Sequence, residues 1–389
     1  MPFSVSDRLS ALPPYPFVEL DRMKREALDR GVDIINLGIG DPDQPTPELI
    51  IEALAEAARN PANHQYPLGT GLADFRQEVA NYYKRKHDVE LKADSEVGAL
   101  IGSKEGIAHL PLAFINPGDV VLFPDPGYPV YQSATLFAGG VPVAMPLLKE
   151  NGFLPDLDAI PNDVLQRTRL MFLNYPNNPT AALATPEFFE KVVKLAKKHE
   201  FVVAHDAAYL DIVFGGEEAL SFLSVPGASE VGIELHSLSK TFNMTGWRIG
   251  FAAGHPDLVA GLMAVKANID SGVFNAVQRA GIAALRNLDD LLPSITSVYE
   301  SRVKVLSEGV RALGWTDFTT PRATFYVWVR NRGNRTSVEM TRTLIETCGV
   351  VTTPGTAFGP SGEGYFRIAL TTTEERLREA CKRIGKAGL

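Results

Sequence analysis

The sequence has few cysteines, no excess of positive charge and no long apolar run. Only two cysteines occur in 389 residues, so a disulfide framework is excluded and a reducing compartment, the cytoplasm, is expected. The formal net charge is -8, which argues against nucleic acid as a partner because phosphate binding needs a basic surface. No window approaches the roughly 18 apolar residues of a membrane span, and the N-terminus lacks the apolar stretch of a signal peptide. We therefore expect a cytoplasmic protein whose main partners are small molecules.

Strand-like and helix-like segments alternate through the middle of the chain. The strand-like runs cover residues 97–101, 120–123, 141–146, 169–174, 201–205, 231–236 and 249–253. Several are separated by helical patterns such as 186–199, where apolar residues recur at helical spacing. This alternation predicts an α/β fold with a large, mostly parallel sheet of seven strands.

The pattern changes near residue 287, where a long helical stretch, 291–313, leads into shorter strands. We therefore predict a smaller α+β domain over residues 286–389, after a large domain over 45–285. Residues 1–44 are predicted to form an N-terminal arm and part of the small domain. The proline-rich stretch 13–16 is expected to be extended and to pack against a partner subunit.

The stretch SLSKTFNMTGWRIG, residues 237–250, carries the most specific chemical pattern. Lys240 follows an apolar strand, and a lysine there enters surroundings dry enough to hold the neutral amine that carbonyl chemistry needs. Ser237, Ser239 and Arg248 add two hydroxyls and a rigid fork of N–H donors, a set that suits a phosphate. A carbonyl-binding lysine beside a phosphate site is what pyridoxal 5′-phosphate (PLP) requires. Taken alone, the stretch also fits a surface lysine near an arginine.

Of two glycine-containing segments that could bind a phosphate, only the second is expected to do so. Residues 38–43, GIGDPD, begin like a dinucleotide fingerprint but lack its third glycine and place Pro42 where a helix should begin, so an NAD site is not expected. Ser103 and Lys104 lie in a Gly/Ser turn that follows a strand and opens a helix, and backbone N–H groups at such a position favour anions.

Four further residues stand at predicted strand ends or in the turns that follow them. Tyr128 could stack on a flat heterocycle or simply pack in the core. Asn178 could donate to a phenolate oxygen or serve turn formation. Asp206 would be costly to bury without a cation such as a pyridinium N–H, although it could also cap a helix. Tyr209, three residues later, could hydrogen-bond a ring oxygen.

Together the motifs S-x-S-K-x(7)-R, N-P-T, D-x-x-Y and a late Phe-Arg pair resemble those of the fold-type I, class I/II PLP-dependent aminotransferases, in order over the whole chain. The resemblance implies that Lys240 carries the cofactor and moves the proton between the substrate α-carbon and C4′ of the cofactor. It implies that Asp206 keeps the ring nitrogen protonated. Asn178 and Tyr209 would hold the ring oxygen, and Tyr128 would stack on the ring.

The same resemblance assigns the phosphate and the substrate carboxylate. The residues implied around the phosphate are Ser103, Lys104, Ser237, Ser239 and Arg248. Tyr66 would reach the phosphate of the neighbouring subunit, because the family is homodimeric with its sites at the interface. Arg367 would pair bidentately with the substrate α-carboxylate, assisted by Asn178 and by the backbone of Gly40.

Within this family, segments such as INLGIGDPDQPTP, GSKEGIAHLPLAFINPGD and EVGIELHSLSKTFNMTGWRIGF look like the LL-diaminopimelate aminotransferases of lysine biosynthesis. Tyr15 and Lys104 would then help to receive the distal end of the substrate. One departure concerns residues 66–72, YPLGTGL, where those enzymes usually carry an acidic residue. We therefore expect turnover of LL-diaminopimelate with 2-oxoglutarate/glutamate, but with loosened discrimination.

Other functions remain open on sequence grounds. The chain could be an aminotransferase of other specificity, for glutamate, aspartate, alanine or aromatic amino acids. It could also be a PLP-dependent lyase on the same fold, which sequence separates poorly from a transaminase. A non-catalytic regulator on an aminotransferase body is disfavoured, because the body starts within the first 40 residues and the net charge is negative.

Overall fold

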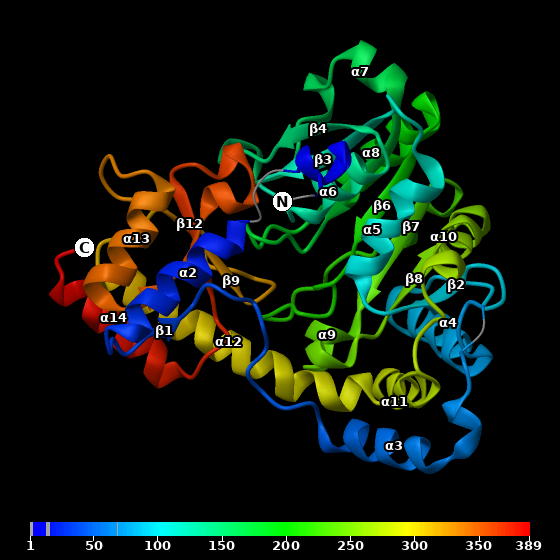
Figure 1. The fold of residues 1–389 in the computed structure, drawn as a ribbon, viewed down its shortest axis with the longest axis horizontal. Coiled ribbons are helices and arrows are strands. Elements are labelled where there is room, and N and C mark those ends of the chain that lie inside the picture. Colours follow the sequence, from blue (N-terminus) through cyan, green and yellow to red (C-terminus); the bar gives the residue numbers. More distant parts are fainter. Residues whose placement is uncertain (1–2, 13–15, 68) are drawn as a thin grey trace.

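The computed structural model describes residues 3–12, 16–67 and 69–389, and a seven-stranded sheet forms its centre (Figure 1). The strands are β2 (Val97–Leu100), β3 (Val120–Asp125), β4 (Val141–Pro146), β5 (Thr168–Asn174), β6 (Val202–Asp206), β7 (Gly232–Ser237) and β8 (Gly250–Gly254). They lie in the order β2-β8-β7-β6-β5-β3-β4. β8 is antiparallel to β2 and β7, whereas the other adjacent pairs are parallel.

Helices cover both faces of this sheet, as a mostly parallel sheet requires. One face packs against α5 (Ser103–Phe114), α6 (Val130–Phe137) and α10 (Pro256–Ile269). The other packs against α4 (Ala73–His87), α8 (Pro186–His199) and α11 (Asn275–Arg286). Two further helices of this part are α3 (Glu48–Arg59), which packs on α11, and α7 (Asn162–Arg167).

α8 illustrates how the sequence sets these helices. Thr185 caps the helix by accepting a hydrogen bond from the backbone N–H of Phe188, and Pro186 occupies the first turn, where its missing N–H costs nothing. Phe189, Val192 and Val193 recur at helical spacing and are buried against the sheet. Capping and apolar spacing together therefore fix both the start of the helix and the face it buries.

The remaining elements form a second layered region beside the large sheet (Figure 1). A three-stranded antiparallel sheet has the order β11-β12-β9, and β1 pairs in parallel with β10. The strands are β1 (Ile35–Asn36), β9 (Tyr326–Arg330), β10 (Val350–Val351), β11 (Thr353–Pro354) and β12 (Tyr365–Ala369). The helices are α2 (Pro16–Asp29), α12 (Leu288–Ala312), α13 (Ser337–Cys348) and α14 (Glu374–Lys386). The short helix α1 (Asp7–Ser10) instead lies against α6 of the large part.

The predicted fold class is confirmed, because each strand-like run of the sequence lies on a strand of the central sheet and the sheet is mostly parallel. The prediction of an extended stretch over 13–16 is wrong at Pro16. Pro16 is the first residue of α2 rather than part of an extended stretch, since proline suits the first turn of a helix. Residues 13–15 lie outside the described residues. Among the helices that the structure describes, none has the length and hydropathy to cross a membrane.

Candidate active site

A cavity of about 470 Å³ opens at the carboxyl ends of the parallel strands. Asp206 is the last residue of β6, Asn174 the last of β5 and Ser237 the last of β7, and all three line the cavity. Ligands bind at this edge in open α/β sheets because the loops that follow the strands converge there. The predicted site residues that line it are Gly40, Ser103, Lys104, Tyr128, Asn178, Asp206, Tyr209, Ser237, Ser239, Lys240, Arg248 and Arg367.

Lys240 lies in the short helix α9 (Leu238–Thr241), directly after the fully buried strand β7. Its Nζ donates a hydrogen bond to the carbonyl oxygen of Gly40 at 2.8 Å. Burial lowers the pKa of this amine to about 8, although the carboxylate of Asp41 opposes the shift. A substantial share of the amine is therefore neutral near pH 8, as attack on a carbonyl requires.

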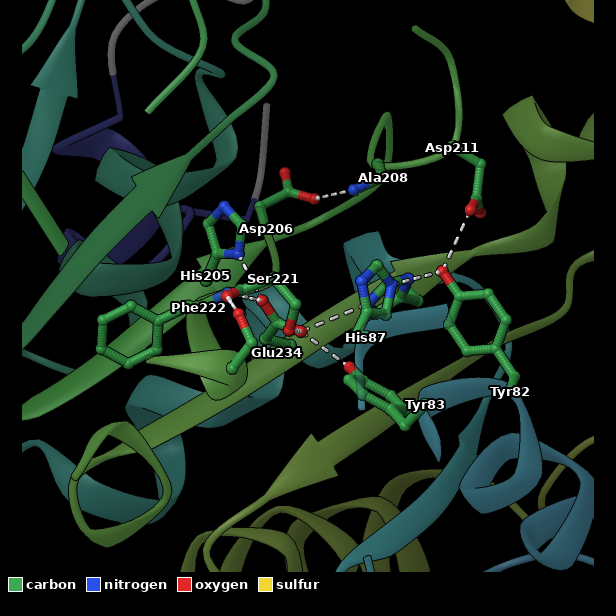
Figure 2. A network of polar contacts seen from close by, with 12 residues as sticks. Tyr82, Tyr83, His87, His205, Asp206, Ala208, Asp211, Ser221, Phe222 and Glu234 are labelled. Carbon is green, nitrogen blue, oxygen red and sulfur yellow. Dashed lines mark hydrogen bonds and ion pairs between the residues drawn. The ribbon is translucent and has the colours of Figure 1, made fainter. Parts of the chain in front are cut away.

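Asp206 is buried, and its carboxylate has two protein partners. Oδ2 accepts a hydrogen bond from the Tyr131 hydroxyl at 2.7 Å. Oδ1 accepts one from the backbone N–H of Ala208 at 3.3 Å (Figure 2). Burial raises the pKa of Asp206, and the hydrogen bond from Tyr131 opposes that rise. A cationic N–H facing this carboxylate from the cavity would stabilise its charged form.

The opposite side of the cavity is built for an anion. Ser103 begins α5, so the unpaired N–H groups of that helix face the cavity, and Arg248 Nη1 lies 3.5 Å from Ser239 Oγ. Gly102 precedes the helix with φ at 107°, and a Cβ there would lie 2.7 Å from Arg248 Nη2. Only glycine therefore allows the guanidinium to approach this turn, which brings helix N–H groups, hydroxyls and a cation to one point.

A second anion site lies at Arg367 on β12. Its guanidinium is buried between the rings of Tyr326 and Phe358, with its central carbon 4.2 Å and 4.7 Å from their centroids. Nη1 donates to Asn178 Oδ1 at 2.8 Å and Nη2 to the carbonyl oxygen of Gly38 at 2.7 Å. Nε has no partner among the described residues. A buried guanidinium held by neutral acceptors is costly, and a carboxylate would complete its pairing.

Tyr209 and Tyr326 also line the cavity. Their hydroxyl oxygens lie 2.8 Å apart, and both side chains are buried. A Cβ at Gly40 would lie 1.9 Å from the hydroxyl oxygen of Tyr326, so glycine is required where this chain segment passes the tyrosine. Sequence reasoning missed both Tyr131 and Tyr326, because each lies in an apolar stretch where an aromatic residue signals only the core.

These groups match those of PLP one by one. The neutral amine suits its carbonyl carbon, the helix N-terminus with Arg248 suits its phosphate, and the buried Asp206 carboxylate suits its ring nitrogen. When bound, PLP supplies an electron sink for the substrate α-carbon. Arg367, which lines the same cavity, remains available for a substrate carboxylate.

Of the two remaining predicted residues, the structure places only Tyr66. Tyr15 lies outside the described residues. Tyr66 is 79% exposed and does not line the cavity of its own chain. Thr70 and Gly71, which follow it, lie against β2. The carbonyl oxygen of Thr70 accepts a hydrogen bond from the backbone N–H of Ala99 at 2.8 Å, and Gly71 packs closely on the same residue.

Comparison with known proteins gives full-length matches. The family model "Aminotransferase class I and II" matches residues 32–384. LL-diaminopimelate aminotransferase from Syntrophobacter fumaroxidans is 55% identical over 386 residues, covering 99% of each chain. The enzyme of the same name from Aquifex aeolicus is 53% identical over 382 residues, covering 98% of each chain.

Solved structures agree with these matches. Substrate-bound BacF from Bacillus subtilis is similar with a TM-score of 0.95 and 38% identity, covering 100% of this chain and 98% of that one. A mutant aspartate aminotransferase from Thermus thermophilus has a TM-score of 0.92 and 30% identity, covering 99% of both chains. Sequence and structure comparisons therefore point to the same family of proteins.

Proposed function

Because this chain belongs to the class I and II aminotransferase family, a family of PLP-dependent enzymes, we propose that it transaminates LL-diaminopimelate, with 2-oxoglutarate and glutamate as the partner pair. The observation that carries the substrate assignment is the full-length similarity to enzymes of that name, at 50–55% identity. The general reaction, transfer of an amino group between an amino acid and a 2-oxo acid, is that of the family.

The roles we propose follow from the positions of the side chains. Lys240, with its pKa lowered to about 8 by burial, holds the cofactor and moves a proton at the substrate α-carbon. Asp206 holds the proton on the ring nitrogen. Asn178 and Tyr209 bind the ring oxygen, and Tyr128 stacks on the ring.

Binding at the two anion sites orients the cofactor and the substrate. Ser103, Lys104, Ser237, Ser239 and Arg248 are the proposed phosphate ligands. Arg367 is proposed to bind the α-carboxylate, aligned by its hydrogen bond to Asn178 and assisted by the backbone of Gly40. Two fixed anion sites at opposite ends of one cavity would hold the α-carbon close to Lys240, which removes much of the entropic cost of the proton transfer.

The proposed enzyme is a homodimer in the cytoplasm. Tyr66 lies on the surface of its own chain and outside its own cavity, which supports its predicted place at the phosphate of a second copy. Tyr15 and Lys104 are the proposed contacts for the distal end of the substrate. Cys348 and Cys381 are both free thiols, which suits a reducing compartment.

The donor preference tests the substrate assignment directly. The PLP-loaded protein is mixed with LL-diaminopimelate, glutamate, aspartate, alanine or an aromatic amino acid, and the loss of the absorbance of the lysine-bound cofactor is followed. We expect LL-diaminopimelate to react, with glutamate also competent. Good activity with an aromatic or small aliphatic donor and none with LL-diaminopimelate would leave only the general transaminase assignment.

Arg367→Lys tests the carboxylate site. Lysine keeps the charge but cannot reproduce the two-pronged N–H fork or bond both Asn178 and Gly38. We expect a loss of about 1.5–3 kcal/mol, roughly 10- to 150-fold in kcat/KM, for every amino acid, with PLP content unchanged. Equal activity on amines that lack the α-carboxylate would contradict this role.

Thr70→Glu tests the segment that departs from the usual LL-diaminopimelate pattern. Thr70 is the better site for the change than Gly69, because Gly69 has φ at 70° and a side chain there would be strained. We expect kcat/KM for LL-diaminopimelate to rise up to about fivefold relative to glutamate, the range of a partly exposed ion pair. Thr70→Gln is the matched control without the charge, and the same change in that variant would refute the electrostatic explanation.

A further inference from the structure

A completely buried carboxylate lies beneath the site, outside the cavity. Glu234, in the middle of β7, has no exposed surface and does not line the pocket. It accepts hydrogen bonds from the Tyr83 hydroxyl at 2.8 Å, the Ser221 hydroxyl at 2.8 Å and the backbone N–H of Phe222 at 2.6 Å (Figure 2). His205 Nδ1 lies 2.7 Å from Oε1, the same oxygen that accepts from Phe222. Burying a charge at this place is costly, so a carboxylate kept here with so many polar neighbours is expected to have a specific role.

The protonation of His205 follows from its two neighbours. His205 pairs with Glu234 across β6 and β7, and its Nε2 accepts the backbone N–H of Tyr175 at 3.2 Å. A ring nitrogen that accepts carries no proton, so the proton is on Nδ1 and is donated to Glu234. Although burial raises the pKa of Glu234, the hydrogen bond from His205 and the nearby His236 ring, with Nε2 3.6 Å from Oε2, hold that pKa well below its usual range. The charged carboxylate therefore selects the ring form that can accept from Tyr175.

The bond from Tyr175 anchors the loop that enters the cavity. This loop follows β5, and the last residue of that strand, Asn174, holds it at a second point. The Asn174 side chain donates to the carbonyl oxygen of Asp206 at 2.7 Å and accepts from the backbone N–H of Asn178 at 2.8 Å. Asn178 in turn accepts from Arg367 at 2.8 Å. The chain of contacts from the buried carboxylate thus ends at the proposed carboxylate site.

We propose that Glu234 and His205 are positioning residues: the carboxylate fixes the histidine ring, and the ring fixes the loop that presents Asn178 to Arg367 and to the cofactor. Neither residue touches the reacting atoms, and both act through the backbone of Tyr175. This inference rests on the proposed function of Asn178 and Arg367. It also explains why the charged carboxylate of Glu234 is kept inside the core.

Two substitutions of His205 separate positioning from packing. The side-chain amide of asparagine lies near the place of Nδ1, so His205→Asn keeps a donor for Glu234 and loses the acceptor for Tyr175. The amide of glutamine reaches the place of Nε2, so His205→Gln keeps an acceptor for Tyr175 and loses the donor for Glu234. The two variants remove one contact each, on opposite sides of the same ring.

We expect His205→Asn to raise KM for amino donors, and the dissociation constant of PLP, about tenfold, the effect of one lost hydrogen bond, with kcat changed less. His205→Gln should keep both constants near those of the unaltered protein, even where its melting temperature is lower. Equal constants in the two variants, or constants that follow the melting temperature, would overturn the proposal. PLP affinity depends on no amino donor, so an incorrect substrate assignment leaves that readout intact.

Glu234→Gln tests the carboxylate, with Tyr83→Phe as its control. Both remove part of the same buried network, but only the first removes the charge that holds the His205 proton on Nδ1. We expect Glu234→Gln to change the His205 ring ¹⁵N shifts and to raise KM and the PLP dissociation constant, whereas Tyr83→Phe lowers the melting temperature alone. Unchanged ¹⁵N shifts in a folded Glu234→Gln protein would refute the role of the charge. If that variant does not fold, the His205 pair decides the question.

Discussion

Lys240→Ala is expected to lose turnover by about 10⁴-fold, the upper range of positioned acid–base catalysis, because the amine proposed to move the proton is removed from the cavity. The residues proposed to bind the phosphate and the ring are unchanged, so the variant should still bind PLP, although without a covalent bond. Turnover and bound PLP are measured on the same preparation, by steady-state assay and by absorbance after dialysis.

A small primary amine added to the Lys240→Ala protein provides the control for folding. Since the cavity keeps its other groups, an amine that diffuses into the vacated volume should restore part of the proton transfer. Partial rescue would show that the lost function is the amine itself. An Ala variant with turnover near that of the unaltered protein would mean that another group moves the proton.

Asp206→Asn is the second large effect. The amide keeps the shape of the side chain and can still accept from the Tyr131 hydroxyl, but it removes the charge that stabilises a protonated ring nitrogen. We expect the barrier to rise by about 3 kcal/mol or more, which is over a hundredfold in rate. The measurement is kcat with saturating donor at full PLP occupancy.

Tyr131→Phe is the matched control for Asp206→Asn. It removes the hydrogen bond to Asp206 Oδ2 and keeps the carboxylate charge, so its effect on kcat should be clearly smaller. If the Asn variant kept near-normal rates, or if the Phe variant were the slower of the two, the charge of Asp206 would not be the source of the rate.

The parts of the site that sequence could predict lie at the ends of strands. Asp206 and Lys240 follow apolar runs whose ends are visible in the sequence, and a polar residue there is costly unless a ligand meets it. The short-range patterns therefore gave both the sheet and the residues at its carboxyl edge. Gly40 was predicted only through the family resemblance, and the structure places its carbonyl oxygen at the Lys240 amine.

The parts that sequence could not predict depend on pairings between distant segments. Tyr326 reaches Tyr209 from a strand 117 residues later, and Glu234 meets His205 only through the register of β6 and β7. A tyrosine in an apolar run looks like core, and a glutamate inside a strand gives no sign of its partners. Gly38 belongs to the segment 38–43, for which the sequence predicts no dinucleotide site, yet its carbonyl oxygen accepts a hydrogen bond from Arg367.

Chemical trapping of the cofactor tests the central claim most directly. The PLP-loaded protein is reduced with borohydride, which makes the bond between cofactor and lysine permanent, and the labelled peptide is identified by mass spectrometry. The account predicts one label, on Lys240, lost on prior incubation with an amino donor that reacts. A label on another lysine, with Lys240 unmodified, would contradict the assignment of the site.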